Sequence, residues 1–356
     1  MSPTPSRPSR RYAAPRVLLA VAALLVPAAA AQAQDAAGYH VTKKIPVGGE
    51  GGWDYTLVDG NRLYVSHATR MVVIDLARDT VVGEVTGTNG IHGIAIARDL
   101  GRGFTSNGRD TSVTIFDLTT LATIGTVKVT GANPDAIQYD PASKRVFTFN
   151  GTGKSATAID AASGQVVGTI PLGGKPEFAQ VDGKGRLWVN IETDTGQVVE
   201  IDTRAMKEVA RYWLPGCEEP SGLALDRAST RLFSVCGNST MAVSDPASRK
   251  VIALVPIGPG VDAAAYDADS KLVFTSNGGN GTLTVVKQES PDRYTVLGNA
   301  PTQRGSRTMS LDPATHRLYL ASAEYGPPPA PAQPGGRPGR PPMIPGSFAI
   351  LVMDRK

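Results

Sequence analysis

The sequence predicts an all-β protein, a seven-bladed β-propeller with four antiparallel strands in each blade. Two series of recurring residues carry this prediction. The first series ends a short β-branched run in every unit and comprises Asp75, Asp117, Asp160, Asp202, Asp245, Lys287 and Asp354. Its spacings are 42, 43, 42, 43, 42 and 67 residues, so seven units are present and the last one carries an insertion.

In the second series, a basic residue comes two or three positions before an aromatic one. Its members are Arg62, Arg102, Arg145, Arg186, Arg231, Lys271 and Arg317. Each unit holds about four strand-sized runs separated by turn residues, and no long segment has a helical period. Four strands in a repeat of roughly 40 to 45 residues are typical of a propeller blade.

The second unit shows the expected strand order. Residues 93–97 form the innermost strand, 103–107 the second, 112–117 the third and 124–129 the outer strand. The tripeptide Ser-Asn-Gly begins at Ser106, at the end of this second strand, and recurs at Ser276. We interpret the two copies as equivalent turns in different blades.

The seventh unit ends at its third strand, residues 348–354, which leaves one edge of that sheet without a partner. Proteins avoid open sheet edges. Residues 39–47, which precede the first unit, have the outer-strand pattern. We therefore expect this N-terminal strand to pair with the C-terminal strand and close the last blade.

The N-terminal residues predict a secretory signal peptide over residues 1–33. Four arginines precede a short apolar run, and Ala31-Gln32-Ala33 resembles a cleavage site. The apolar run contains Pro27 and is shorter than the roughly 20 residues of a membrane span, which argues against a transmembrane anchor. We expect residues 34–356 to form one exported domain, periplasmic or secreted and monomeric.

The net positive charge of the chain comes from this predicted leader. Residues 1–33 contain four Arg and no acidic residue, so their removal lowers Lys+Arg from 36 to 32 against 32 Asp+Glu. A neutral mature protein lacks the field that attracts nucleic acid or anionic lipid. The charge balance therefore argues against nucleic acid as a partner.

The repeats resemble the YVTN-type propeller repeats of the YncE-like family of exported bacterial proteins. The resemblance covers residues 39–356 and implies the propeller fold and an exported location. Members of that family are commonly described as DNA-binding, and related seven-bladed propellers include lactonases and lyases. Fold does not determine function, so the resemblance only suggests an activity.

Candidate site residues gather on one face of the predicted disc. The strand order brings the outer-to-inner and second-to-third loops together on this face, which we call the ring face. The residues that open the inner strands are Asp54, His92, Asp135, Glu177, Ser221, Asp262 and Arg307. Converging carboxylates raise one another's pKa or require a cationic partner. The alternative interpretation is ordinary turn chemistry around a wet channel.

A divalent metal is a candidate cofactor at the same place. His67 ends a second strand and is expected near His92, and Asp54 or Asp135 could add carboxylate ligands. No compact motif such as HExxH supports a metal, and scattered histidines are usually loop residues.

The two cysteines, Cys217 and Cys236, fall on the ring face in neighbouring strands. In an oxidising compartment we expect a disulfide that closes a loop of about 20 residues and contributes roughly 2–4 kcal/mol. A metal site or a reactive thiol is the alternative.

The insertion spans residues 325–347 and is rich in proline and glycine. Proline prevents regular pairing, so we expect an extended or mobile loop on the ring face, over the channel mouth. An unconstrained surface loop is the alternative. Within the insertion, Arg337 and Arg340 could bind an anionic partner.

Three functional hypotheses follow. The first is a non-enzymatic protein that binds a small molecule, a metal ion or an envelope protein at the ring face. The second is a lactonase-like or lyase-like enzyme, with or without a metal, in which Glu177 or Asp135 is the base, His92 the acid or a metal ligand, and Arg307 holds an anionic group. Nucleic-acid binding, which the family resemblance suggests, is the third.

Overall fold

The computed structural model describes residues 1, 3, 36–329, 339 and 341–356. The chain divides into two compact units, 1–32 and 33–356, and all that follows concerns the second unit. The predicted leader, apart from residues 1 and 3, lies outside the described residues. Among the described residues, no helix has the length and apolar character needed to cross a bilayer.

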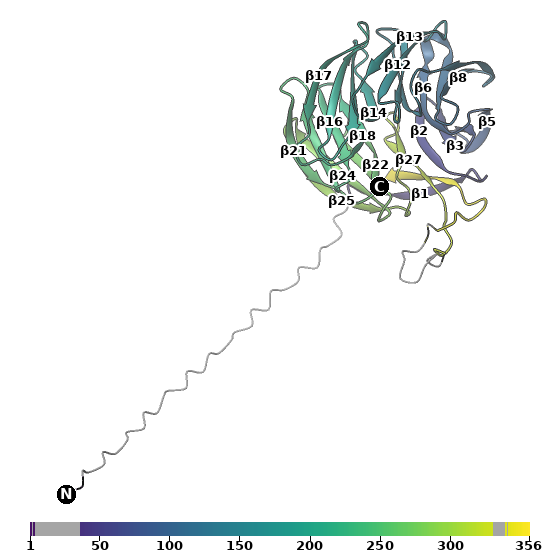
Figure 1. The fold of residues 1–356 in the computed structure, drawn as a ribbon. Coiled ribbons are helices and arrows are strands. Elements are labelled where there is room, and N and C mark those ends of the chain that lie inside the picture. Colours follow the sequence, from purple (N-terminus) through teal and green to yellow (C-terminus); the bar gives the residue numbers. More distant parts are fainter. Residues whose placement is uncertain (2, 4–35, 330–338, 340) are drawn as a thin grey trace. The chain divides into compact units, whose positions relative to one another are not determined.

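Seven four-stranded antiparallel sheets form a ring, as the sequence predicts (Figure 1). The innermost strand of each sheet contacts the innermost strands of both neighbours, so these seven strands make a closed circle. They are β2 (Trp53–Asp59), β6 (Ile91–Ala97), β10 (Pro134–Asp140), β14 (Lys175–Val181), β18 (Pro220–Asp226), β22 (Val261–Asp267) and β26 (Met309–Asp312).

The remaining strands follow in the predicted order. The second strands are β3 (Arg62–His67), β7 (Arg102–Asn107), β11 (Arg145–Asn150), β15 (Arg186–Glu192), β19 (Arg231–Cys236), β23 (Leu272–Asn277) and β27 (Arg317–Ser322). The third strands are β4 (Arg70–Asp75), β8 (Ser112–Asp117), β12 (Ser155–Asp160), β16 (Gln197–Asp202), β20 (Thr240–Asp245), β24 (Thr282–Ser290) and β28 (Ala349–Arg355). The outer strands are β5 (Thr80–Thr86), β9 (Thr123–Lys128), β13 (Val166–Pro171), β17 (Lys207–Trp213), β21 (Lys250–Pro256), β25 (Arg293–Pro301) and β1 (Tyr39–Pro46). A short 3-10 helix, η1 (Arg98–Leu100), follows β6.

The predicted closure of the last blade is confirmed. Strand β1 pairs antiparallel with β28, from Tyr39 opposite Arg355 to Pro46 opposite Ala349. The N-terminal strand thus gives β28 the partner that its outer edge would otherwise lack, and the two ends of the domain belong to one sheet.

The aromatic positions of the second series form the core between the sheets. All seven are at most 4% exposed: Tyr64, Phe104, Phe147, Trp188, Phe233, Phe274 and Tyr319. Burying such a side chain contributes roughly 1.5–3 kcal/mol. The sequence repeat therefore reflects a repeated packing arrangement, in which each sheet places one large aromatic side chain in the core.

In several blades the basic position of the same series links neighbouring blades. The guanidinium of Arg145 donates to the carbonyl oxygens of Thr203 and Arg204 in the next blade, at 2.7 Å each. Arg102 donates to the carbonyl oxygens of Ala161 and Ala162 in the same way. Each contact satisfies a turn between a third and an outer strand, so the arginine holds two blades in register.

The recurring asparagine at the end of the second strand is buried and links this strand to the third strand by hydrogen bonds. The amide nitrogen of Asn150 donates to Ser155 Oγ at 3.1 Å and to Thr157 Oγ1 at 3.0 Å, and its oxygen accepts from Thr148 at 3.1 Å. Asn107 makes the corresponding contacts, and so does the equivalent residue of the sixth blade. The repeated phrase is thus a hydrogen-bonded link between two strands as well as a turn.

Candidate functional site

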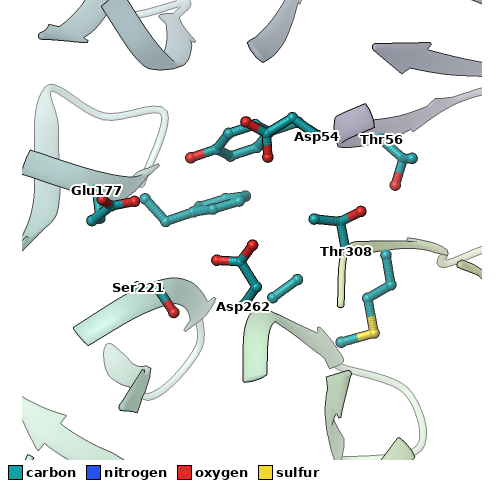
Figure 2. A pocket seen from close by; sticks show the side chains of 10 residues that line it. Asp54, Thr56, Glu177, Ser221, Asp262 and Thr308 are labelled. Atoms are coloured by element: carbon teal, nitrogen blue, oxygen red, sulfur yellow. The ribbon is translucent and has the colours of Figure 1, made fainter. Parts of the chain in front are cut away.

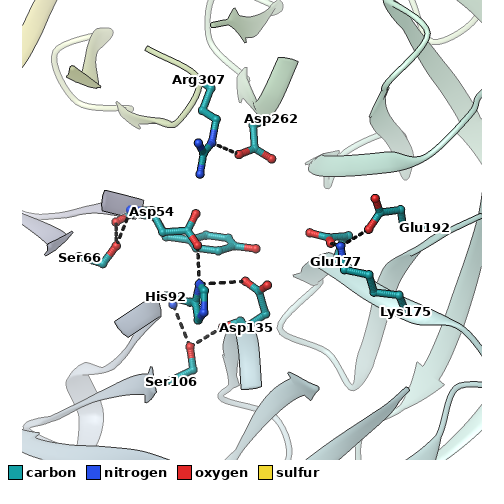
Figure 3. Close-up of polar contacts among 12 residues, drawn as sticks. Asp54, Ser66, His92, Ser106, Asp135, Lys175, Glu177, Glu192, Asp262 and Arg307 are labelled. Carbon is teal, nitrogen blue, oxygen red and sulfur yellow. Dashed lines mark hydrogen bonds and ion pairs between the residues drawn. The ribbon is translucent and has the colours of Figure 1, made fainter. Parts of the chain in front are cut away.

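The innermost strands are irregular where the candidate residues lie. In β10, Pro134 pairs with Asn150 but Ile137 pairs with Thr148, so the backbone bulges at Asp135. Register shifts occur at the matching positions of β2, β6, β14, β18 and β22. A bulge redirects a side chain and is common beside functional sites. Figure 3 shows the redirected side chains, with Arg307, arranged around a common centre.

Polar side chains on the second strands hold these bulges in place. Ser66 Oγ accepts from the Asp54 amide at 3.1 Å and donates to the Tyr55 carbonyl at 3.0 Å. Ser106 donates to the Asp135 carbonyl, and Ser276 does the same to that of Arg307. In the fifth blade, the Ser221 carbonyl accepts from Asn190 at 3.0 Å. The backbone beneath the ring is therefore fixed by hydrogen bonds.

Asp54, His92 and Asp135 form the first group at the channel mouth. His92 Nδ1 lies 2.6 Å from Asp54 Oδ2 and 3.8 Å from Asp135 Oδ1. Burial opposes a charge on His92, but the two carboxylates outweigh it and raise the pKa of the imidazole. Burial and the nearby Asp54 raise the pKa of Asp135. One nitrogen and two carboxylate oxygens lie within 4.8 Å of one another, close enough to hold a metal ion.

His67, which the sequence places near His92, is buried beside Phe348. His67 is 1% exposed, and its ring stacks on Phe348 with centroids 4.2 Å apart. Burial lowers the pKa of His67. The side chain at the end of β3 points into the packing of the last blade rather than to the mouth, so His67 is absent from the group that could hold a metal.

Asp262 and Arg307 form the second group. Arg307 Nε donates to Asp262 Oδ2 at 2.7 Å. Burial and the negative charge of Asp54 nevertheless raise the pKa of Asp262 to about 6. The guanidinium therefore only partly offsets the surrounding negative charge.

Glu177 belongs to a third group that the sequence did not reveal. Lys175 Nζ lies 2.6 Å from Glu177 Oε1 and also contacts Glu192, which is opposite Lys175 in the β14–β15 pairing. Burial and the nearby Asp135 raise the pKa of Glu177. Hydrogen bonds from Glu177 and Lys175 outweigh burial at Glu192 and lower its pKa. These opposite pKa shifts favour a proton on Glu177 over one on Glu192, and the role of Glu177 as a base stays a prediction.

Two aromatic side chains close the channel below these groups. Tyr55 and Phe178 directly follow Asp54 and Glu177, and their ring centroids are 4.9 Å apart. Both rings line the pocket under the ring face and also the wider cavity of about 660 Å³ farther along the channel. They form the floor of the upper pocket.

Hydroxyl groups complete this upper pocket. Ser221, Thr56 and Thr308 line it together with Asp54, Glu177 and Asp262 (Figure 2). Thr56 is 8% and Thr308 5% exposed, and neither hydroxyl has a hydrogen-bond partner among the described residues. Buried polar groups are normally paired, so both hydroxyls call for a ligand or a water molecule.

Neighbouring features of the ring face agree with two further expectations. Cys217 and Cys236 form the predicted disulfide, with Cα atoms 5.3 Å apart, just before Ser221. The Tyr325 ring lies against Gly305, in the loop between β25 and β26, so the insertion starts on the ring face.

The base of the insertion is more regular than expected. Tyr325 and Met343 form a bridge, and the Gly326 amide donates to the Pro342 carbonyl at 2.9 Å. The two ends of the insertion are thus hydrogen-bonded to each other in spite of its proline content. The remainder, with Arg337 and Arg340, lies outside the described residues.

Comparison with known proteins identifies the fold alone. No family model and no curated protein sequence matches the chain. A chain of hydrazine synthase from Kuenenia stuttgartiensis is 18% identical, with a TM-score of 0.66 over 80% of this chain and 94% of that one. U3-55K is 11% identical (TM-score 0.71; 87% and 97% covered), and a chain of the mitotic checkpoint complex is 13% identical (0.70; 88% and 94%). The protein therefore shares the β-propeller fold with these chains.

Proposed function

We propose that the protein is a non-enzymatic binding protein whose ring face holds a small cation. One observation carries the proposal: at the channel mouth five carboxyl groups meet only two permanently cationic side chains and one histidine, His92. The acids are Asp54, Asp135, Glu177, Glu192 and Asp262, and the cations are Lys175 and Arg307. Burial and repulsion raise the pKa of three of these acids, and a bound cation would offset the repulsion.

The rigidity of the mouth supports binding. Its five acids stand on four blades, with Glu177 and Glu192 on the same one, and hydrogen bonds fix several of the bulges beneath them. A site built on strands of a closed ring needs little reorganisation when a ligand enters, so little binding energy is lost to ordering.

We also propose that the protein is exported and monomeric and related to the YncE-like propellers. The repeats, the N-terminal signal pattern and the disulfide support this proposal, because disulfides persist in oxidising compartments. A small molecule is the proposed ligand, and an envelope protein is the alternative partner.

The test is a thermal-unfolding screen of the purified protein with divalent metal chlorides, organic ammonium salts, sugars and lactones. We expect at least one cation to raise the Tm in a saturable way. The shift should disappear in Asp54→Asn and persist in Glu289→Gln, an exposed acid on β24 away from the mouth. A screen in which no cation shifts the Tm overturns the proposal.

One observation favours the enzymatic alternative. Burial and Asp135 raise the pKa of Glu177 to about 9, and burial and Asp54 raise the pKa of Asp135 to about 6. Two carboxyl groups with different pKa values are the pairing of acid and base that many hydrolases and lyases use. In this version Glu177 is the acid and Asp135 the base. Turnover of a lactone that is lost in Glu177→Gln, with the Tm unchanged, would establish this function in place of simple binding.

A further inference from the structure

We propose that the cation is an organic primary amine, whose ammonium group occupies the pocket above Tyr55 and Phe178. This inference rests on the proposed function and names the ligand class of the same site. Three carboxyl groups, three aliphatic hydroxyls and the rings of Tyr55 and Phe178 line that pocket, and none of its described lining residues is basic.

The size of the pocket suits an ammonium group. Its centre has room for roughly one water-sized group, which is about the volume of –NH₃⁺. A quaternary ammonium, with methyl groups in place of N–H bonds, is too large for this space and has no hydrogen to donate.

The spacing of the carboxylates favours an amine over a metal in this pocket. A metal draws its ligand atoms close together, and among the described residues the compact group at the mouth is Asp54, His92 and Asp135. Glu177 and Asp262 are outside that group. An ammonium has three N–H donors that point in different directions, so it can bond to oxygens that are too far apart to share one metal ion.

The unpaired hydroxyls are the second observation that points to a ligand. Thr56 and Thr308 are each more than nine-tenths buried and have no hydrogen-bond partner among the described residues. An ammonium donor would supply the missing bond to one of them, while Asp54 and Asp262 would balance its charge (Figure 2).

The aromatic floor contributes in a different way. Tyr55 and Phe178 present ring surface to the pocket, and an ammonium over such a surface gains cation–π attraction. Because the floor closes the channel below, the carbon chain of the amine must run outward through the mouth, past Arg307.

Isothermal titration calorimetry with n-butylamine, 1,4-diaminobutane, tetramethylammonium, ZnCl₂ and MgCl₂ tests the inference on the purified protein. We expect the two primary amines to bind at one site and tetramethylammonium not to bind. Asp262→Asn and Thr308→Val should each weaken amine binding, the former by roughly tenfold or more, as expected for a lost charge-assisted bond. Glu289→Gln is the matched control and should bind normally.

A second pair of variants distinguishes a specific loss of binding from misfolding. Phe178→Leu keeps an apolar floor but removes the ring, and Thr308→Ser keeps the hydroxyl; both should retain the wild-type fold by circular dichroism. We expect Phe178→Leu to weaken amine binding and Thr308→Ser to preserve it. If metals bind and amines do not, the inference is overturned while the cation site stands. If neither binds, both proposals fail.

Discussion

Asp262 shows how strongly one side chain in the ring depends on its surroundings. Its partner Arg307 lies at hydrogen-bonding distance, yet the pKa of Asp262 is raised because burial and Asp54 act against ionisation. From the sequence, the convergence of acids could be predicted, because the repeat assigns each to an equivalent position. Lys175 and Glu192 could not, because their meeting depends on the pairing of two strand ends.

The raised pKa of Asp262 predicts a pH-dependent stability. The folded protein favours the protonated acid, so this contribution is complete below about pH 4, where the unfolded chain is also protonated, and is lost as the pH rises through about 6. Asp262→Asn cannot ionise and escapes the loss. We expect the Tm of the variant relative to wild type to increase between pH 4 and pH 8. A difference that stays constant with pH would contradict this reasoning.

The buried asparagines allow a second prediction at this scale. Asn150→Ala removes three hydrogen bonds, to Thr148, Ser155 and Thr157, of which the Thr157 hydroxyl still keeps its contact with Thr130. We expect the free energy of unfolding to fall by about 2–4 kcal/mol in urea titrations. Asn61→Ala, at an exposed position, is the control and should change it by less than about 0.5 kcal/mol. Equal effects of the two substitutions would contradict a stabilising role for the hydrogen bonds of Asn150.

At the scale of single elements, strand order was predictable and strand irregularity was not. Period and alternation place the strands, because they depend on which residues face the core. A bulge depends instead on how two strands align, as at Asp135 between Pro134 and Ile137. The orientation of His67 is a similar case: the sequence locates the end of β3, but the packing against Phe348 decides where the imidazole points.

The closing strand β1 gives a testable contrast within one element. Ile45 is 1% exposed and belongs to the core of the last blade, whereas Val41 in the same strand is 37% exposed. We expect Ile45→Ala to lower the free energy of unfolding by about 2–4 kcal/mol and Val41→Ala to lower it by less than about 1 kcal/mol. Chemical denaturation of the two variants measures both. Similar values for both would mean that β1 does not seal the last blade.

At the scale of the whole molecule, the distribution of charge decides which partners are excluded. The residues after the predicted leader carry equal numbers of basic and acidic groups, and the mouth gathers acids. Nucleic-acid binding requires a basic surface and releases counterions on contact with phosphates.

We therefore expect no binding to single-stranded oligonucleotides at physiological salt. Fluorescence anisotropy with labelled oligo-dT and a mixed-sequence strand would measure it, from low salt to about 0.15 M. Residual binding at low salt should vanish as the salt increases. Tight binding that survives physiological salt would restore the nucleic-acid hypothesis that the family resemblance suggests.

The bulged inner strands have a consequence for how such a protein can change over evolutionary time. Each ring position sits on its own repeat, and in several blades a neighbouring serine or asparagine anchors its backbone through main-chain groups that every amino acid possesses. A substitution at one position therefore leaves the scaffold of the other six intact. The selectivity of this architecture can therefore change one ring position at a time. A descendant in which arginine replaced two or three of the acids would bind anions on the same propeller scaffold.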